Sequence, residues 1–238
     1  MARADRSGLE DEATGLARRS WLGALVAVSM LAGCGGGASP TPTSIPRAAV
    51  APGTYTSSSF RPPITYTLPA GWLVADDAAD YLALEPVTSD ATGIRIFRSP
   101  RAASQDPTCP IASAPGVGTT AKDLVDWIRS RPGLVAGDPV PVTIGGLAGL
   151  RIDIAIVAGW KPSCPFASGL PTVALFVGST DTSFRWVVAG SERLQLSVLD
   201  VPGAGTVVVD IDAFDGSLMD GLLPAAAPII GSLKFGLP

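Results

Sequence analysis

Hydrophobic and polar residues alternate with a period of two in several separate stretches of the chain. This pattern is typical of β-strands that have one face toward a hydrophobic core. In RIDIAIV (151–157), three isoleucines alternate with Arg151 and Asp153. In ITYTL (64–68), apolar residues likewise alternate with two threonines. By this pattern we expect strands at 64–68, 93–98, 151–157, 183–188, 193–199 and 206–214.

Glycine and proline residues separate these stretches, and two segments have the pattern of a β-hairpin. PVTIGGLAGLRIDI is expected to turn at Gly145-Gly146, and VLDVPGAGTVVVDI at Pro202-Gly203. Adjacent glycines allow the positive φ angles that tight hairpin turns require. Sequential hairpins predict a mostly antiparallel sheet.

Two segments change to the period of an α-helix. Residues 120–130 have Thr120 as a candidate N-cap, Asp123 three residues later, and an Arg-Pro-Gly stop. Residues 215–230 are also helix-like, but Pro224 and Pro228 are expected to break or kink the helix. A short strand, SLKF, should follow.

Runs of antiparallel strands with two helices between them predict an α+β fold: a curved, mostly antiparallel sheet with two main helices packed on it. An α/β/α sandwich is one arrangement of these layers. We expect a single domain over residues 53–238, a length that suits one hydrophobic core.

The N-terminal region differs from the rest of the chain in composition. Arg18 and Arg19 precede an apolar run that is too short for a transmembrane helix and ends in Leu31-Ala32-Gly33-Cys34. This ending resembles the lipobox of bacterial lipoproteins. The resemblance implies removal of residues 1–33, which include an N-terminal extension, and attachment of lipid to Cys34. Residues 34–52, rich in Gly, Ser and Pro, should form a flexible tether.

Alternatives to this N-terminal interpretation stay open. An ordinary cleaved secretory signal could also end near a cysteine, and an uncleaved anchor is the least favoured case. Arg18-Arg19 also resembles a twin-arginine export signal, although two arginines are common in any such basic region. The expected location is extracytoplasmic, on the bacterial cell membrane through the lipid.

The charge of the chain limits its partners. With 17 basic and 21 acidic residues the net charge is −4. A mildly acidic protein is unsuited to nucleic acid and to electrostatic adhesion to anionic lipid. Contact with the membrane would therefore depend on the lipid.

Two of the three cysteines occur in similar surroundings, DPTCPIAS around Cys109 and KPSCPFAS around Cys164. Thiols of an exported domain tend to pair, so we expect a Cys109–Cys164 disulfide. Two unpaired structural cysteines, or a reactive thiol, are the alternatives. Two cysteines without any histidine give too few ligands for a zinc site.

Three acidic residues near the C-terminus form a weak candidate for a cation site. Asp210 and Asp212 would share one face of a strand, and Asp215 could turn back toward them. The favoured alternative is a solvated strand end that leads into a helix N-terminus, where acids are stabilised by the helix dipole. We expect no metal and no cofactor.

Signals for catalysis are sparse. The sequence contains no Gly-x-Ser-x-Gly motif, and a Ser-His-Asp triad is impossible without histidine. A carboxylate pair for glycoside chemistry stays open, because the fold sets such pairs. We expect a protein that is not an enzyme.

The order of elements over residues 53–238, beginning with GTYTSSSFRPPITYTLPAGW, resembles uncharacterised extracytoplasmic proteins of GC-rich bacteria. It is also similar in topology to the PsbP/Mog1-like sandwich. Neither resemblance implies a known activity.

Two functional hypotheses follow. The first is a lipid-anchored envelope module that binds a protein, a surface polymer or a small ligand. The second is a carrier of lipids or other apolar ligands with a cavity between sheet and helix. An apolar pocket of several hundred Å³ would favour the carrier.

Overall fold

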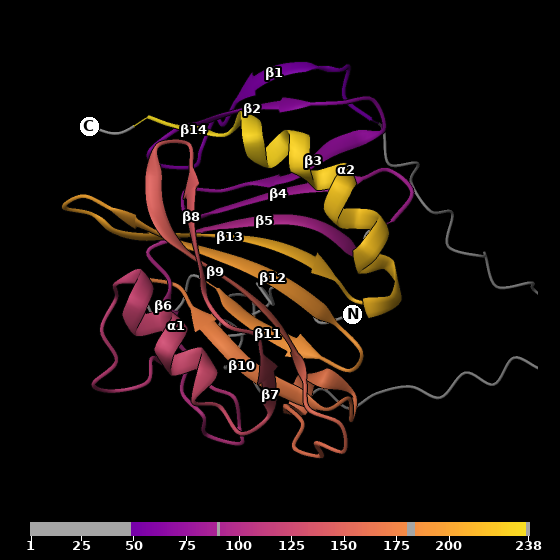
Figure 1. The fold of residues 1–238 in the computed structure, drawn as a ribbon. Helices are drawn as coiled ribbons and strands as arrows, with labels where there is room; N and C mark the ends of the chain where they lie inside the picture. The colour runs from indigo at the N-terminus through magenta and orange to yellow at the C-terminus, as the bar shows by residue number, and fades with distance from the viewer. Residues whose placement is uncertain (1–48, 90, 180–183, 237–238) are drawn as a thin grey trace, which may run out of the picture.

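The computed structural model describes residues 49–89, 91–179 and 184–236. Within these residues the strands form three sheets, every strand pairing is antiparallel, and there are two α-helices (Figure 1). The predicted fold class is therefore confirmed. No helix in these ranges is long and apolar enough to cross a membrane.

The largest sheet forms the middle layer of the molecule. Its strands are, in spatial order, β3 (Trp72–Asp77), β4 (Tyr81–Pro86), β5 (Thr92–Arg98), β13 (Gly205–Ala213), β12 (Arg193–Val201), β9 (Leu147–Ile156) and β7 (Leu134–Ala136), with β8 (Val140–Ile144) also paired to β9. Both predicted hairpins are present, as β8–β9 and β12–β13.

One outer layer covers each face of this sheet (Figure 1). On one face lie α2 (Met219–Ser232) and a sheet of β1 (Gly53–Thr56), β2 (Ile64–Leu68) and β14 (Lys234–Phe235). On the other face lie α1 (Ala121–Arg129) and a sheet of β6 (Arg101–Ala102), β10 (Thr172–Val177) and β11 (Arg185–Ala189). Two short 3₁₀ turns, η1 (Pro165–Ala167) and η2 (Gly216–Leu218), complete the regular structure of the described residues.

Because of these two layers, the central strands are buried on both faces. On β13, Val207, Val209 and Ile211 face the α2 layer, and Val208 faces the α1 layer. The alternation in the sequence of β13 therefore separates two buried faces rather than a buried face and a solvated one. The same holds for β5, where Ile96 and Phe97 are fully buried in different clusters.

Helix α1 begins and ends close to the predicted residues. The Thr120 side chain accepts a hydrogen bond from the Asp123 backbone, and the Asp123 carboxylate accepts one from the Thr120 backbone. This is the predicted capping box. The Asp200 carboxylate adds a further cap by accepting from the Ala121 backbone N–H at 2.8 Å.

Helix α2 corrects one part of the prediction for residues 215–230, because Pro224 and Pro228 do not break it; the kink stays a prediction. The helix runs without interruption over 14 residues. Both prolines lie on its exposed side, four residues apart, where water can solvate the carbonyls that they leave without partners. The buried residues, including Leu222 and Ile229, hold the opposite side against the core.

Contacts with the core begin slightly before the predicted domain start at Gly53. The Val50 backbone N–H donates to the Trp72 carbonyl at 3.1 Å, and the Val50 side chain is partly buried. Residues 1–48 lie outside the described ranges, and with them Cys34 and the predicted signal peptide.

Candidate functional site

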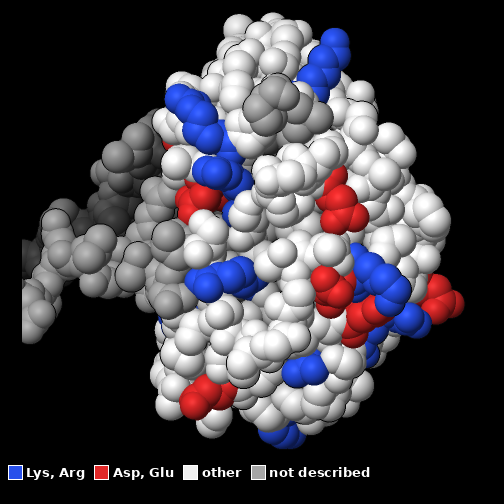
Figure 2. Space-filling model, turned by 90° about the vertical axis from the view of Figure 1, so that its left-hand side faces the viewer, with Lys and Arg blue, Asp and Glu red and all other residues white. Residues whose placement is uncertain are grey.

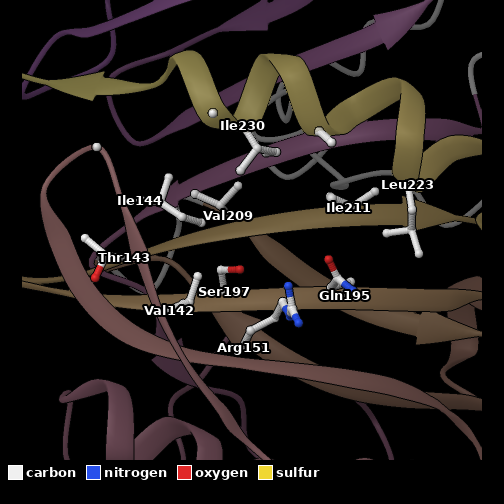
Figure 3. Close-up of a pocket in the computed structure, with 13 residues that line it drawn as sticks. Val142, Thr143, Ile144, Arg151, Gln195, Ser197, Val209, Ile211, Leu223 and Ile230 are labelled. Carbon is white, nitrogen blue, oxygen red and sulfur yellow. The ribbon is translucent and has the colours of Figure 1, made fainter.

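A groove with a volume of about 500 Å³ lies between α2, the β8–β9 hairpin and the central sheet (Figure 3). Its floor comes from β9, β12 and β13, one wall from the hairpin and the other from α2. Its lining residues are Val142, Thr143, Ile144, Gly145, Arg151, Gln195, Ser197, Val209, Ile211, Leu223, Ala227, Ile230 and Gly231.

Strand register sets the order of residues across the floor. Ser197 on β12 pairs with Arg151 on β9 and with Val209 on β13. Directly paired residues of antiparallel strands point to the same face of the sheet. The floor therefore changes from charged to polar to apolar between β9 and β13.

The wall formed by α2 is apolar and contains a gap. Leu223, Ala227 and Ile230 share one side of the helix, since residues three and four apart are neighbours on a helix. The small side chain of Ala227 and the missing one of Gly231 leave space between the helix and the sheet. Larger side chains at these positions would fill the groove.

The hairpin turn closes one end of the groove against the C-terminal strand. Gly145 has φ +58°, and a Cβ added there would lie 2.6 Å from the Phe235 ring. A side chain at residue 145 would thus push the turn away from β14. The sequence prediction of a turn at two glycines is confirmed, and the close approach explains why the first must be glycine.

Arg151 is the charged residue of the lining, and its side chain extends toward the space between Ser197 and Gln195 (Figure 3). Among the described residues, no carboxylate forms an ion pair with its guanidinium. The neighbouring Asp153 carboxylate instead accepts a hydrogen bond from the Gln195 amide at 2.9 Å.

On the opposite side of the central sheet, next to β13, lies a group of buried charged residues, which we call the acid cluster. Its members are Glu85, Arg95, Glu192, Asp210 and Asp212, each at most 5% exposed.

Some acids of the acid cluster form ion pairs or hydrogen bonds, while some of their oxygens do not. Arg95 forms an ion pair with Glu85 at 2.8 Å and a longer one with Asp212 at 3.6 Å. The Asp210 carboxyl accepts a hydrogen bond from the Trp186 indole at 2.9 Å. One oxygen of Asp210 and one of Asp212 have no hydrogen-bond partner among the described residues.

Burial shifts the pKa values of these acids upward. The pKa of Glu192 is raised to about 8 by burial and then by the charge of Asp212. Burial, opposed by Arg95, raises the pKa of Asp212 to about 6. The pKa of Asp210 is also raised well above its usual range by burial and by Asp212. A buried carboxyl favours its neutral form.

The structure does not bring the predicted cation-site residues together. Asp210 and Asp212 share a face, as expected, but that face is buried, so the alternative of a solvated strand end is wrong for them. Asp215 is exposed and caps η2, accepting from the Ser217 backbone N–H at 3.0 Å. In the described ranges, no three Asp, Glu, Cys or His residues are grouped so as to hold a metal ion.

The predicted disulfide is confirmed: Cys109 and Cys164 are bonded, with their Cα atoms 5.6 Å apart. Their two loops cover the outer side of the β6–β10–β11 sheet, where both cysteines belong to one small buried cluster that also contains Ala174 and Val187. The bond therefore joins loops on the α1 side of the molecule, away from the groove.

The distribution of charged side chains on the surface does not indicate a binding site as clearly as the groove does. On the face in Figure 2, basic and acidic side chains are interspersed among a larger number of uncharged residues. We therefore take the groove as the candidate site. Sequence reasoning did not single out its residues, although Arg151 and Gly145 belong to a hairpin that it predicted.

No protein-family model matches this chain, and no curated protein matches it in sequence. Among solved structures, it is similar to LpqN of Mycobacterium tuberculosis, which is involved in cell envelope biogenesis. That match has 15% identity and a TM-score of 0.40, and it covers 74% of this chain and 83% of LpqN.

Two further structures are similar to the chain. The cyanobacterial PsbP protein CyanoP from Synechocystis sp. PCC 6803 has 11% identity and a TM-score of 0.36, over 84% of this chain and 99% of CyanoP. A protein of Bacteroides thetaiotaomicron has 11% identity and a TM-score of 0.31, over 72% and 44% of the two chains. All three similarities are distant, and neither ligand nor activity follows from them.

Proposed function

We propose that this protein is a lipid-anchored extracytoplasmic binding protein, without enzymatic activity, that holds the apolar chain of a small ligand in the groove beside α2. The groove carries the proposal. Its volume of about 500 Å³ lies within the ~300–1,000 Å³ range of small-molecule sites. It lies between sheet and helix, where the carrier hypothesis expected a cavity.

The chemistry of the lining supports binding. Val209, Ile211, Leu223 and Ile230 offer apolar surface, while Arg151, Gln195 and Ser197 offer hydrogen-bond donors at its edge. Mostly apolar walls with a few placed polar groups are typical of ligand sites. One guanidinium, one amide and one hydroxyl can orient a ligand by hydrogen bonds.

The location is supported by the disulfide, since such bonds persist in oxidising compartments. The lipid anchor at Cys34 is tested by Cys34→Ala in the native host. The variant should move from the membrane to the soluble or secreted fraction. Continued retention in the membrane would mean that the apolar run itself acts as the anchor.

The groove is tested with a neutral fluorescent apolar probe, 1-N-phenylnaphthylamine. The probe is added to a purified protein that begins at Val50 and continues to the end of the sequence. The probe should bind with enhanced fluorescence. Ala227→Phe, which places a ring in the gap beside the sheet, should abolish binding. Ala225→Phe is the matched control, because Ala225 is exposed on the same helix and does not line the groove.

Loss of binding in both variants, or in neither, would contradict the proposed site. Circular dichroism and thermal unfolding should show that both variants are folded. A second readout is the native protein itself: mild purification without detergent, followed by solvent extraction and mass spectrometry, should yield a bound amphipathic molecule.

A further inference from the structure

The groove has a polar edge and an apolar interior, and the two are arranged in a fixed order. Arg151, Ser197 and Val209 lie side by side on β9, β12 and β13 through their strand pairing. The polar edge is thus on the β9 side, and the apolar surface continues from β13 to α2. A ligand that matches both must itself be amphipathic.

From this arrangement we infer that the ligand is a single-chain carboxylate, such as a fatty acid, whose head group binds Arg151 while its chain lies under α2. The inference rests on the proposed function and specifies the ligand class of the same groove. An arginine guanidinium pairs with a carboxylate through two parallel hydrogen bonds.

The charge of the lining favours a head group with one negative charge. Arg151 is the charged side chain among the lining residues, and within the described part of the chain its guanidinium has no carboxylate partner. One guanidinium balances one carboxylate, whereas a phosphate monoester would leave excess negative charge. Ser197 can add a neutral donor.

Asp153 opposes an anion and has to be accounted for. It lies two residues from Arg151 on the same face of β9, but its carboxylate accepts a hydrogen bond from Gln195 at 2.9 Å. Gln195 thus lies between Asp153 and the centre of the groove. The positive group nearest to Ser197 is Arg151, its direct cross-strand partner.

The size of the groove favours one chain over two. Its α2 wall runs from Leu223 to Gly231, which corresponds to about 12 Å of helix axis. A volume of about 500 Å³ takes one drug-sized molecule. A diacyl lipid would leave a large part of its apolar surface in water.

The test is competition against the neutral probe by ligands that share a twelve-carbon chain: dodecanoate, dodecanol and dodecyltrimethylammonium. Dodecanoate should displace the probe at about tenfold lower concentration than dodecanol, since a hydrogen bond between charged partners adds to the same apolar contact. The cation should compete least well. Dihexanoyl-phosphatidylglycerol, a diacyl lipid that stays monomeric in water, should not displace the probe.

Arg151→Gln should remove the advantage of dodecanoate over dodecanol, with both competitors measured against the probe on the same variant. Arg151→Lys should restore part of it, and Arg98→Gln, at an exposed arginine of β5 outside the lining, should keep it. If Arg151→Gln fails to fold, the salt dependence of wild-type dodecanoate binding gives the same information, because added salt should weaken dodecanoate and not dodecanol.

The outcomes separate the two proposals. A probe that does not bind the wild type overturns the proposed function itself. A probe that binds, with equal competition by dodecanoate and dodecanol, overturns the carboxylate inference and leaves the groove in place. An advantage of dodecanoate that persists in Arg151→Gln also overturns the inference, because Arg151 would then not bind the head group. Displacement of the probe by the diacyl lipid would replace the fatty acid with a diacyl ligand.

Discussion

The two faces of strand β13 are both buried but differ in polarity. Val209 and Ile211, which are 1% and 6% exposed, form part of the apolar floor of the groove, whereas Asp210 and Asp212 on the other face belong to the acid cluster. The apolar face thus borders a groove, and the charged face is covered by a closed layer. The comparison shows that a residue's surroundings depend on the layer that covers it as much as on its own strand.

The acid cluster should be the more sensitive face. Arg95 is its buried cation, so Arg95→Met removes the ion pairs with Glu85 and Asp212. We expect a loss of roughly 3–5 kcal/mol in the free energy of unfolding at neutral pH. Urea denaturation measures this loss, and the neutral probe should still bind wherever the variant is folded.

Arg98→Met serves as the control on the same strand, because Arg98 is exposed. It should change stability by less than about 0.5 kcal/mol. Similar losses in both variants would mean that the acid cluster is no more sensitive than the surface.

The disulfide gives a second test of the separation between the two sides. Cys109→Ser with Cys164→Ser opens a loop with a sequence separation of 55 residues. In the chain-entropy model this costs at most roughly 4 kcal/mol, and less if the unfolded chain stays compact. Calorimetry should show a lower melting temperature, with unchanged probe affinity below it.

Loss of probe affinity in the folded double variant would contradict this picture. It would show that the loops on the α1 side affect the shape of the groove. A single Cys→Ser variant is a poor control, because it leaves a free thiol that can react.

A third test uses pH. Because the pKa of Glu192 is raised to about 8 and that of Asp212 to about 6, the folded state holds more protons than the unfolded state between about pH 4 and pH 8. The unfolding free energy therefore falls as pH rises through this window. Acidification from pH 8 to pH 5 should raise it by a few kcal/mol, on the order of several degrees in melting temperature.

Glu192→Gln should flatten this dependence, and Asp126→Asn, at an exposed acid of α1, should leave it unchanged. The acids with lowered pKa values, such as Asp77 and Asp215, do not interfere, since they are ionised in both states over this range. A melting temperature that falls on acidification would refute the raised pKa values.

Period-two alternation identified strands with one distinct apolar face, such as β2 and β9, and the strong helical pattern identified α1 with its cap. It did not identify β4 or β10, where YLALEP and TVALFV are buried on both faces and have little alternation. Such runs do not reveal their periodicity, since both faces require apolar residues.

Neither the acid cluster nor the groove could be predicted from the sequence, because both depend on how separate elements pack together. Asp210 and Asp212 look like a solvated face in the sequence, but β11 covers that face and its Trp186 indole donates to Asp210. The groove depends on which side of α2 carries Ala227 and Gly231, and the prolines of that helix predicted a break or a kink instead. The disulfide was predictable, because the prediction required only two cysteines in a domain that is exported to an oxidising compartment.

The pairings at the centre of the sheet join distant parts of the chain. Strands β5 and β13 join residue 92 to residue 213, and β14 pairs with β2 from the opposite end of the described chain. Contacts between such distant segments form slowly. The groove needs the β8–β9 hairpin, β12, β13 and α2 in place together, so only a folded chain can hold a ligand there.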